Sequence, residues 1–139
     1  TYTLGNSGGG VGAMVYGCEL EAQRALSFSG PTDLRPSFLR QHGDTRGQAV
    51  IHALKRRLDD NQLNLRGWLE DRELRCPIHA YFCEKENQDA VQAKNIAHLP
   101  EVSLHPVDYY SEHECIGSAL GTGDLLREFN NVIEEIHNE

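Results

Sequence analysis

The stretch TYTLGNSGGGVG, residues 1–12, decides the fold predicted for this chain. Residues 1–4 are β-prone and run directly into a glycine-rich turn. The apolar residues beyond the turn recur at the spacing of one helix face: Val11, Met14, Val15 and Cys18. The sequence therefore predicts a strand, a tight turn and a helix in direct succession.

The rest of the chain continues this alternation of strands and helices. Further strands are expected at residues 25–29 (ALSFS), 76–83 (CPIHAYFC) and 102–107 (VSLHPV). Further helices are expected at residues 90–98, from residue 115 and at residues 124–136. Such alternation predicts the α/β class, as a three-layer sandwich with a mainly parallel sheet between helices. The first strand is expected at an edge of the sheet.

Residues 32–75 interrupt the alternation. Helical patterns at residues 48–58 and 62–69 predict a mostly helical insertion between the second and third strands, and the second pattern carries the only tryptophan, Trp68. We therefore expect one domain, residues 1–139, with a helical insertion at residues 32–75.

Composition argues against several classes of partner. The formal net charge is −8, which disfavours nucleic acid because phosphate binding needs clustered Lys and Arg. No run approaches the ~20 apolar residues of a membrane span. The cysteines have neither CxxC nor zinc-like spacing: Cys18, Cys76, Cys83 and Cys115. We expect free thiols, no metal, no cofactor and a cytoplasmic location.

Residues 5–9, GNSGG, have the form G-x-S-x-G between a predicted strand and a predicted helix. This pattern is typical of a serine nucleophile on a strained turn at the carboxyl edge of a sheet. It makes Ser7 the candidate nucleophile. It also places the backbone N–H of Gly8 at a helix N-terminus, where it would point at the oxyanion of an acyl transfer.

The neighbouring glycines have a steric role in this interpretation. Side chains two residues before and two after the serine would collide, so Gly5 and Gly9 are expected to relieve the crowding. Gly10 and Gly12 are expected to let the helix lie close to the sheet.

Two other interpretations of the glycines stay open. They can form only a turn, or they can form a dinucleotide-binding fingerprint with a pyrophosphate at the helix N-terminus. A dinucleotide site would want an acidic residue at the end of the second strand, and Asp33 comes slightly late for that role.

A serine nucleophile needs a base within hydrogen-bond reach and a carboxylate that orients the base. Residues 109–113 (YYSEH) follow the fourth predicted strand and place His113 just before a helix. An acidic loop, residues 84–89 (EKENQD), follows the third. Serine, acid and histidine in this order, with the last two after later strands, match the arrangement of α/β-hydrolases.

Nearly the whole chain resembles the C-terminal half of an α/β-hydrolase, from the nucleophile elbow to the last helix. The resemblance implies Ser7 as nucleophile, His113 as general base and then acid, and the Gly8 N–H as an oxyanion donor. It implies a small-molecule ester or related acyl substrate, cleaved through an acyl-serine.

The resemblance leaves the acid open. Asp89 is favoured by residue type, although it can equally cap a helix that begins at residue 90. Glu86 is the alternative, because it stands three residues after Cys83, which takes the place of the family's usual glycine. Glu84 is the third candidate.

Two departures from the family matter. Its members carry further strands before the elbow, with a second oxyanion donor among them, so we expect an N-terminal segment or a partner to complete the sheet. A non-catalytic binding or accessory module that keeps the fold therefore stays open as an alternative. The insertion occupies the family's lid position, and its candidate pocket residues are Phe38, Leu39, Leu63, Leu65 and Trp68.

Overall fold

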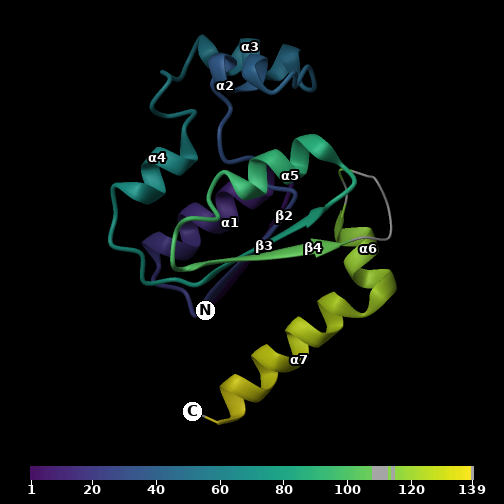
Figure 1. Ribbon diagram of the computed structural model, residues 1–139. Helices are drawn as coiled ribbons and strands as arrows, with labels where there is room; N and C mark the ends of the chain where they lie inside the picture. The colour runs from purple at the N-terminus through teal and green to yellow at the C-terminus, as the bar shows by residue number, and fades with distance from the viewer. Residues whose placement is uncertain (108–112, 114, 139) are drawn as a thin grey trace.

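The computed structural model describes residues 1–107, 113 and 115–138. It is an α/β structure built on one four-stranded sheet (Figure 1). The strands are β1 (Tyr2–Asn6), β2 (Arg24–Phe28), β3 (Ile78–Cys83) and β4 (Val102–Val107). They lie side by side in sequence order, and each neighbouring pair is parallel. The predicted α/β class and parallel sheet are confirmed, with β1 at one edge of the described sheet.

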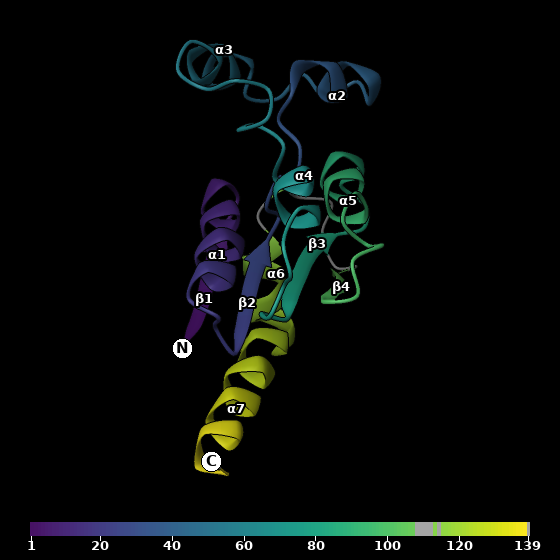
Figure 2. The same ribbon diagram turned by 90° about the vertical axis from the view of Figure 1, so that its left-hand side faces the viewer.

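Helices cover both faces of this sheet (Figures 1 and 2). One face carries α1 (Gly8–Glu19), α4 (Leu65–Glu70) and α5 (Asn87–Lys94), and the other carries α6 (Cys115–Thr122) and α7 (Asp124–His137). Successive residues of a strand point to opposite faces. In β3, Ile78 accordingly packs in the cluster beneath α1 and α4, while Tyr81 and Cys83 pack against α6. The result is three layers.

The insertion between β2 and β3 holds α2 (Pro36–Gln41), α3 (Gln48–Lys55) and α4. In both views α2 and α3 stand beyond the layer of α1 and α5 (Figures 1 and 2). By contrast, α4 joins the core through Leu65 and Leu69. It begins later than the helix predicted at residues 62–69 because the Asn64 side chain accepts a hydrogen bond from the Gly67 N–H and so caps the helix there.

The start of α5 also differs from the prediction. The helix begins at Asn87, and its cap is Glu86, whose side chain accepts a hydrogen bond from the Gln88 N–H. Asp89 therefore lies within the first turn, and the prediction that it caps a helix from residue 90 is wrong. The turn of α5 that precedes residue 90 is what carries Asp89 toward the sheet edge.

Glycines let α1 lie close to the sheet, as expected for Gly10. A Cβ atom at Gly10 would stand 2.6 Å from the Ser27 Oγ, and one at Gly17 would stand 2.8 Å from the Ala25 Cβ. Gly10 and Gly17 are two helical turns apart and share one face. Gly12 points elsewhere, since its nearest neighbour would be Tyr16 at 4.0 Å, so the prediction for Gly12 is wrong.

All four cysteines belong to the described part of the chain and are free thiols. Among the described helices, none combines the length and apolar character required to cross a membrane.

Candidate active site

Ser7 lies on the turn between β1 and α1 in a backbone conformation that side-chain-bearing residues rarely adopt. Its φ is 52° and its ψ is −124°, which stores strain. Two hydrogen bonds of 2.8 Å hold the turn: the Ser7 N–H donates to the carbonyl of Phe28 in β2, and the Ser7 carbonyl accepts from the Gly10 N–H. The turn thus fixes Ser7 at the carboxyl end of β1.

Gly5 is required by this turn. A Cβ atom there would stand 1.9 Å from the carbonyl oxygen of Gly9. A Cβ atom at Gly9 would meet nothing within 4 Å. The expected crowding is therefore real at Gly5, but it sets a side chain against the helix backbone and not against a second side chain, and the role predicted for Gly9 is wrong.

The structure brings Ser7, Asp89 and His113 together. The Ser7 Oγ lies 2.7 Å from the His113 Nε2, and the Asp89 Oδ2 and Oδ1 lie 2.8 and 3.0 Å from the His113 Nδ1. A carboxylate only accepts hydrogen bonds, so Nδ1 carries the proton and Nε2 of the neutral ring accepts from the serine hydroxyl. The three side chains thus form a continuous hydrogen-bonded chain, which is the geometry that a serine nucleophile, its base and an orienting acid would need.

Neither alternative acid contacts His113 in the described structure. Glu86 caps α5, and Glu84 accepts a hydrogen bond from the Lys94 Nζ at 2.8 Å. The Asp89 side chain is only 2% exposed, whereas the His113 side chain is 41% exposed, so a buried carboxylate meets an imidazole that solvent and substrate can reach. Of the three carboxylates that the sequence left open, Asp89 alone is placed to orient this base.

Gly8 is the first residue of α1, so its N–H has no acceptor within the helix. The helix N-terminus also carries partial positive charge. The N–H of Gly8 is therefore suited to an oxyanion that forms next to Ser7.

A pocket of about 470 Å³ begins at Gly8 and runs between α1 and the insertion. Its apolar lining comes from both: Val11 and Val15 of α1, and Leu34, Leu54, Leu58, Leu63, Leu65 and Trp68 of the insertion. Leu63, Leu65 and Trp68 were expected there. Leu39 instead lines a separate hollow between α2 and α3, and Phe38 packs against the ring of His42.

Asp33 offers little to a dinucleotide. Its buried carboxylate accepts from the Arg35 backbone N–H at 3.0 Å and from the Arg35 Nη2 at 2.6 Å. These bonds occupy the oxygens that would have to receive a ribose hydroxyl. Within the described residues, no three His, Cys, Asp or Glu side chains are grouped so as to hold a metal ion.

Cys115 lies near the candidate site but is buried. Its Sγ accepts a hydrogen bond from the Ser29 Oγ at 3.2 Å. Burial raises the pKa of this thiol to about 11, so it stays protonated near neutral pH and is a poor nucleophile. Ser7 is thus the better-placed nucleophile of the two.

Arg46 is a neighbour of the site that the sequence did not reveal. Its Nη1 lies 2.9 Å from the Asp89 Oδ1, although the two residues are 43 positions apart. No local motif marks Arg46, because its contact depends on how the insertion folds over α5. The remainder of the loop predicted before α6, residues 108–112 and 114, lies outside the described residues.

Comparison of the chain with protein-family models, with curated proteins and with solved structures found no match. The functional argument therefore depends on the geometry of the site.

Proposed function

We propose that this chain carries the catalytic residues of a serine hydrolase that cleaves an ester or related acyl substrate through an acyl-serine intermediate. The observation that carries the proposal is the His113 imidazole, which bridges the Ser7 hydroxyl at 2.7 Å and the Asp89 carboxylate at 2.8 Å. This arrangement, on a strained strand-to-helix turn, is what nucleophilic acyl transfer requires.

In the first half of the reaction, the Ser7 Oγ attacks the carbonyl carbon of the substrate. Its proton passes to the Nε2 of His113, and Asp89 stabilises the imidazolium that results. The carbonyl oxygen becomes an oxyanion, which the N–H of Gly8 stabilises. When the tetrahedral intermediate collapses, the leaving alkoxide takes the proton from His113 and departs as an alcohol.

In the second half, water attacks the acyl-serine. His113 accepts a proton from the water and returns it to the Ser7 Oγ as the carboxylic acid leaves. No cofactor enters either half. Two protons pass through Nε2 in turn: the proton of Ser7 leaves with the alcohol, and a proton from water restores the Ser7 hydroxyl.

The apolar pocket next to Gly8 supports a substrate with an apolar acyl or alkoxy group. Its volume of about 470 Å³ is in the range of small-molecule sites. In this proposal the insertion acts as a lid that forms one wall of the pocket. The net charge of −8 argues against nucleic acid as a substrate.

The proposal includes a segment or partner that pairs with β1 and supplies a second oxyanion donor. Strand β1 is an edge of the described sheet, and Gly8 is the one donor that we assign. A missing donor typically lowers the rate by ~10²–10³-fold, so completion of the sheet would raise activity strongly.

A fluorophosphonate probe, which modifies activated serines, tests the proposal on the intact protein. We expect covalent labelling that Ser7→Ala abolishes and that Ser37→Ala, a change of an exposed serine in α2, leaves unchanged. Equal labelling of intact protein and Ser7→Ala would refute the assignment of the nucleophile. If the intact protein is not labelled at all, the non-catalytic binding module becomes the better interpretation.

A further inference from the structure

Arg46 joins the insertion to the candidate acid. It lies between α2 and α3, and its Nη1 donates to the Asp89 Oδ1 at 2.9 Å. The same oxygen lies 3.0 Å from the His113 Nδ1. The guanidinium and the imidazole therefore share one carboxylate oxygen that is almost completely buried.

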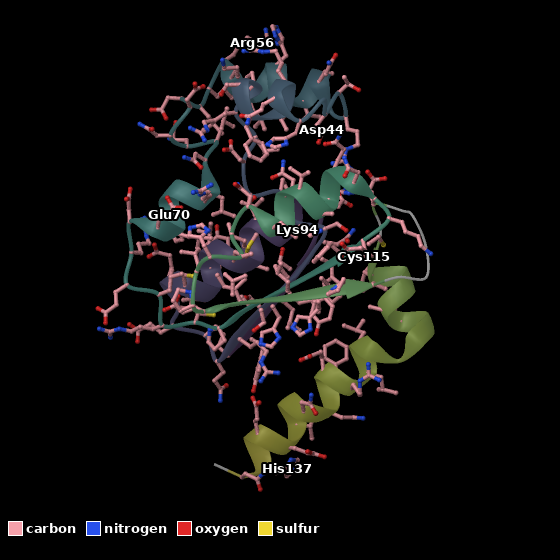
Figure 3. The ribbon with its side chains drawn as sticks, viewed as in Figure 1. Asp44, Arg56, Glu70, Lys94, Cys115 and His137 are labelled. Atoms are coloured by element: carbon pink, nitrogen blue, oxygen red, sulfur yellow. The ribbon has the colours of Figure 1, made fainter. Side chains whose placement is uncertain are left out.

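The guanidinium is itself held in a fixed orientation by Asp44. The Asp44 Oδ1 accepts from the Arg46 Nε at 3.1 Å, and its Oδ2 accepts from the Nη2 at 2.9 Å. The Arg46 backbone N–H also donates to Oδ1, at 3.0 Å. Such side-on pairing restricts the plane of the guanidinium. Figure 3 shows Asp44 on the side of the insertion that faces the start of α5.

The charges of this pair are mutually stabilising. Burial alone would raise the pKa of Asp44, but the hydrogen bonds from Arg46 lower it below its ordinary value. The bonds to Asp44 in turn raise the pKa of Arg46. A second contact ties the insertion to α5, since the Gln88 Nε2 donates to the His42 carbonyl at 3.1 Å.

We propose that Arg46 is a positioning residue that holds the Asp89 carboxylate against His113. Ser7 would then be reactive only when the insertion that carries Arg46 is folded. The inference rests on the proposed function. Its basis is a continuous line of contacts from Asp44 through Arg46, Asp89 and His113 to Ser7.

This role has two separable consequences. Without the planar guanidinium of Arg46, the Asp89 carboxylate and the imidazole lose their fixed orientation. Misplacement of catalytic groups lowers the reaction rate. Without its positive charge, the Asp44 and Asp89 carboxylates that Arg46 pairs with are left uncompensated near the imidazole and favour its protonated form. The base would then be lost at a higher pH.

The experiment compares Arg46→Gln, Arg46→Lys and the control Arg57→Gln, which removes an exposed charge from the same insertion. The rate of fluorophosphonate labelling is measured against pH. The NMR titration of His113 is followed in parallel, because it needs no turnover. For Arg46→Gln we expect labelling slower by about 10- to 100-fold on the plateau, with the acid limb moved to higher pH by on the order of one pH unit.

Arg46→Lys keeps the positive charge but loses the planar guanidinium. We therefore expect slower labelling, with the acid limb of the pH profile at the same pH as in the unchanged protein. If Arg46→Gln matches Arg57→Gln in both rate and titration, the positioning role is wrong, while labelling of Ser7 in the unchanged protein still supports the hydrolase. If the titration of His113 moves but no variant is labelled, the contact stands and the proposed function fails.

Discussion

Two histidine sites on this sheet differ in their partners. At its carboxyl edge, His113 has the Asp89 carboxylate at one ring nitrogen and the Ser7 hydroxyl at the other. On the face beneath α7, His79 of β3 and His105 of β4 contact each other, with the His79 Nδ1 2.9 Å from the His105 Nε2. A carboxylate favours a protonated imidazole, whereas a second imidazole that is also protonated opposes it.

We call His79 and His105 the face pair, and their surroundings strengthen this difference. Burial lowers the pKa of both rings, and the charge of His105 lowers that of His79 further. The His105 ring also stacks on Tyr81, with centroids 4.6 Å apart. Burial therefore favours the neutral, packed form of His79 and His105, whereas the proposed function requires His113 to gain and release a proton.

The largest effect expected from this comparison is that of Asp89→Asn. An amide at this position loses the negative charge and can favour the wrong tautomer of His113, which in comparable triads lowers the rate by ~10³–10⁴-fold. The measurement is the rate of fluorophosphonate labelling at Ser7. Glu84→Gln is the matched control, because Glu84 pairs with Lys94 on the surface. Equal losses in the two variants would remove Asp89 from its assigned role.

The sequence predicted the strands of the sheet and the turn that carries Ser7, because both depend on local patterns. The alternating stretch at residues 102–107 gives β4 with its observed bounds, and G-x-S-x-G places Ser7 on its turn. The start of α5 was missed because the capping bond of Glu86 is a local contact that the apolar pattern does not report. That error also concealed why Asp89 reaches His113.

Contacts that depend on strand register or on the fold of the insertion were beyond the sequence. His79 is paired in register with Ser103, and His105 is paired with Tyr81, so the two imidazoles meet diagonally only once β3 and β4 are aligned. Arg46 likewise reaches Asp89 across 43 residues. Neither contact leaves a periodic signal along the chain.

Backbone strain is a second way in which the two sites differ, and Ser7→Gly measures it. Glycine adopts the φ of 52° at this position without strain, whereas alanine, like serine, adopts it at an energetic cost. Ser7→Gly and Ser7→Ala both lose the hydrogen bond to His113 and both abolish labelling. We expect the glycine variant to have a free energy of unfolding higher than the alanine variant by about 1 kcal/mol.

Urea unfolding of the two variants supplies the measurement. Ser37→Gly and Ser37→Ala provide the comparison inside helix α2, where glycine is the less stable of the pair by about 1 kcal/mol. If glycine is also the less stable at position 7, the turn carries no strain that matters to stability.

The smallest effect concerns the pH dependence of stability at the face pair. Because the folded protein lowers the pKa of His79 and His105, the unfolded chain binds protons more readily. The free energy of unfolding should therefore fall as the pH drops through the ordinary histidine pKa of about 6.5, until it reaches the folded values. His105→Phe keeps an aromatic ring on Tyr81 and removes one of the two titrating groups.

We expect urea unfolding of His105→Phe at pH 7.5 and pH 5 to show a smaller loss than the unchanged protein, by on the order of 1 kcal/mol or less because both rings are partly exposed to screening solvent. His52→Gln, at an exposed position of α3, should keep the full loss. Labelling of Ser7 in His105→Phe at pH 7.5 should be unchanged. A contrary result would be slower labelling of Ser7 together with the smaller pH-dependent loss of stability. The two histidine sites would then be coupled through the sheet, and the distinction between His113 and the packed pair of His79 and His105 would be wrong.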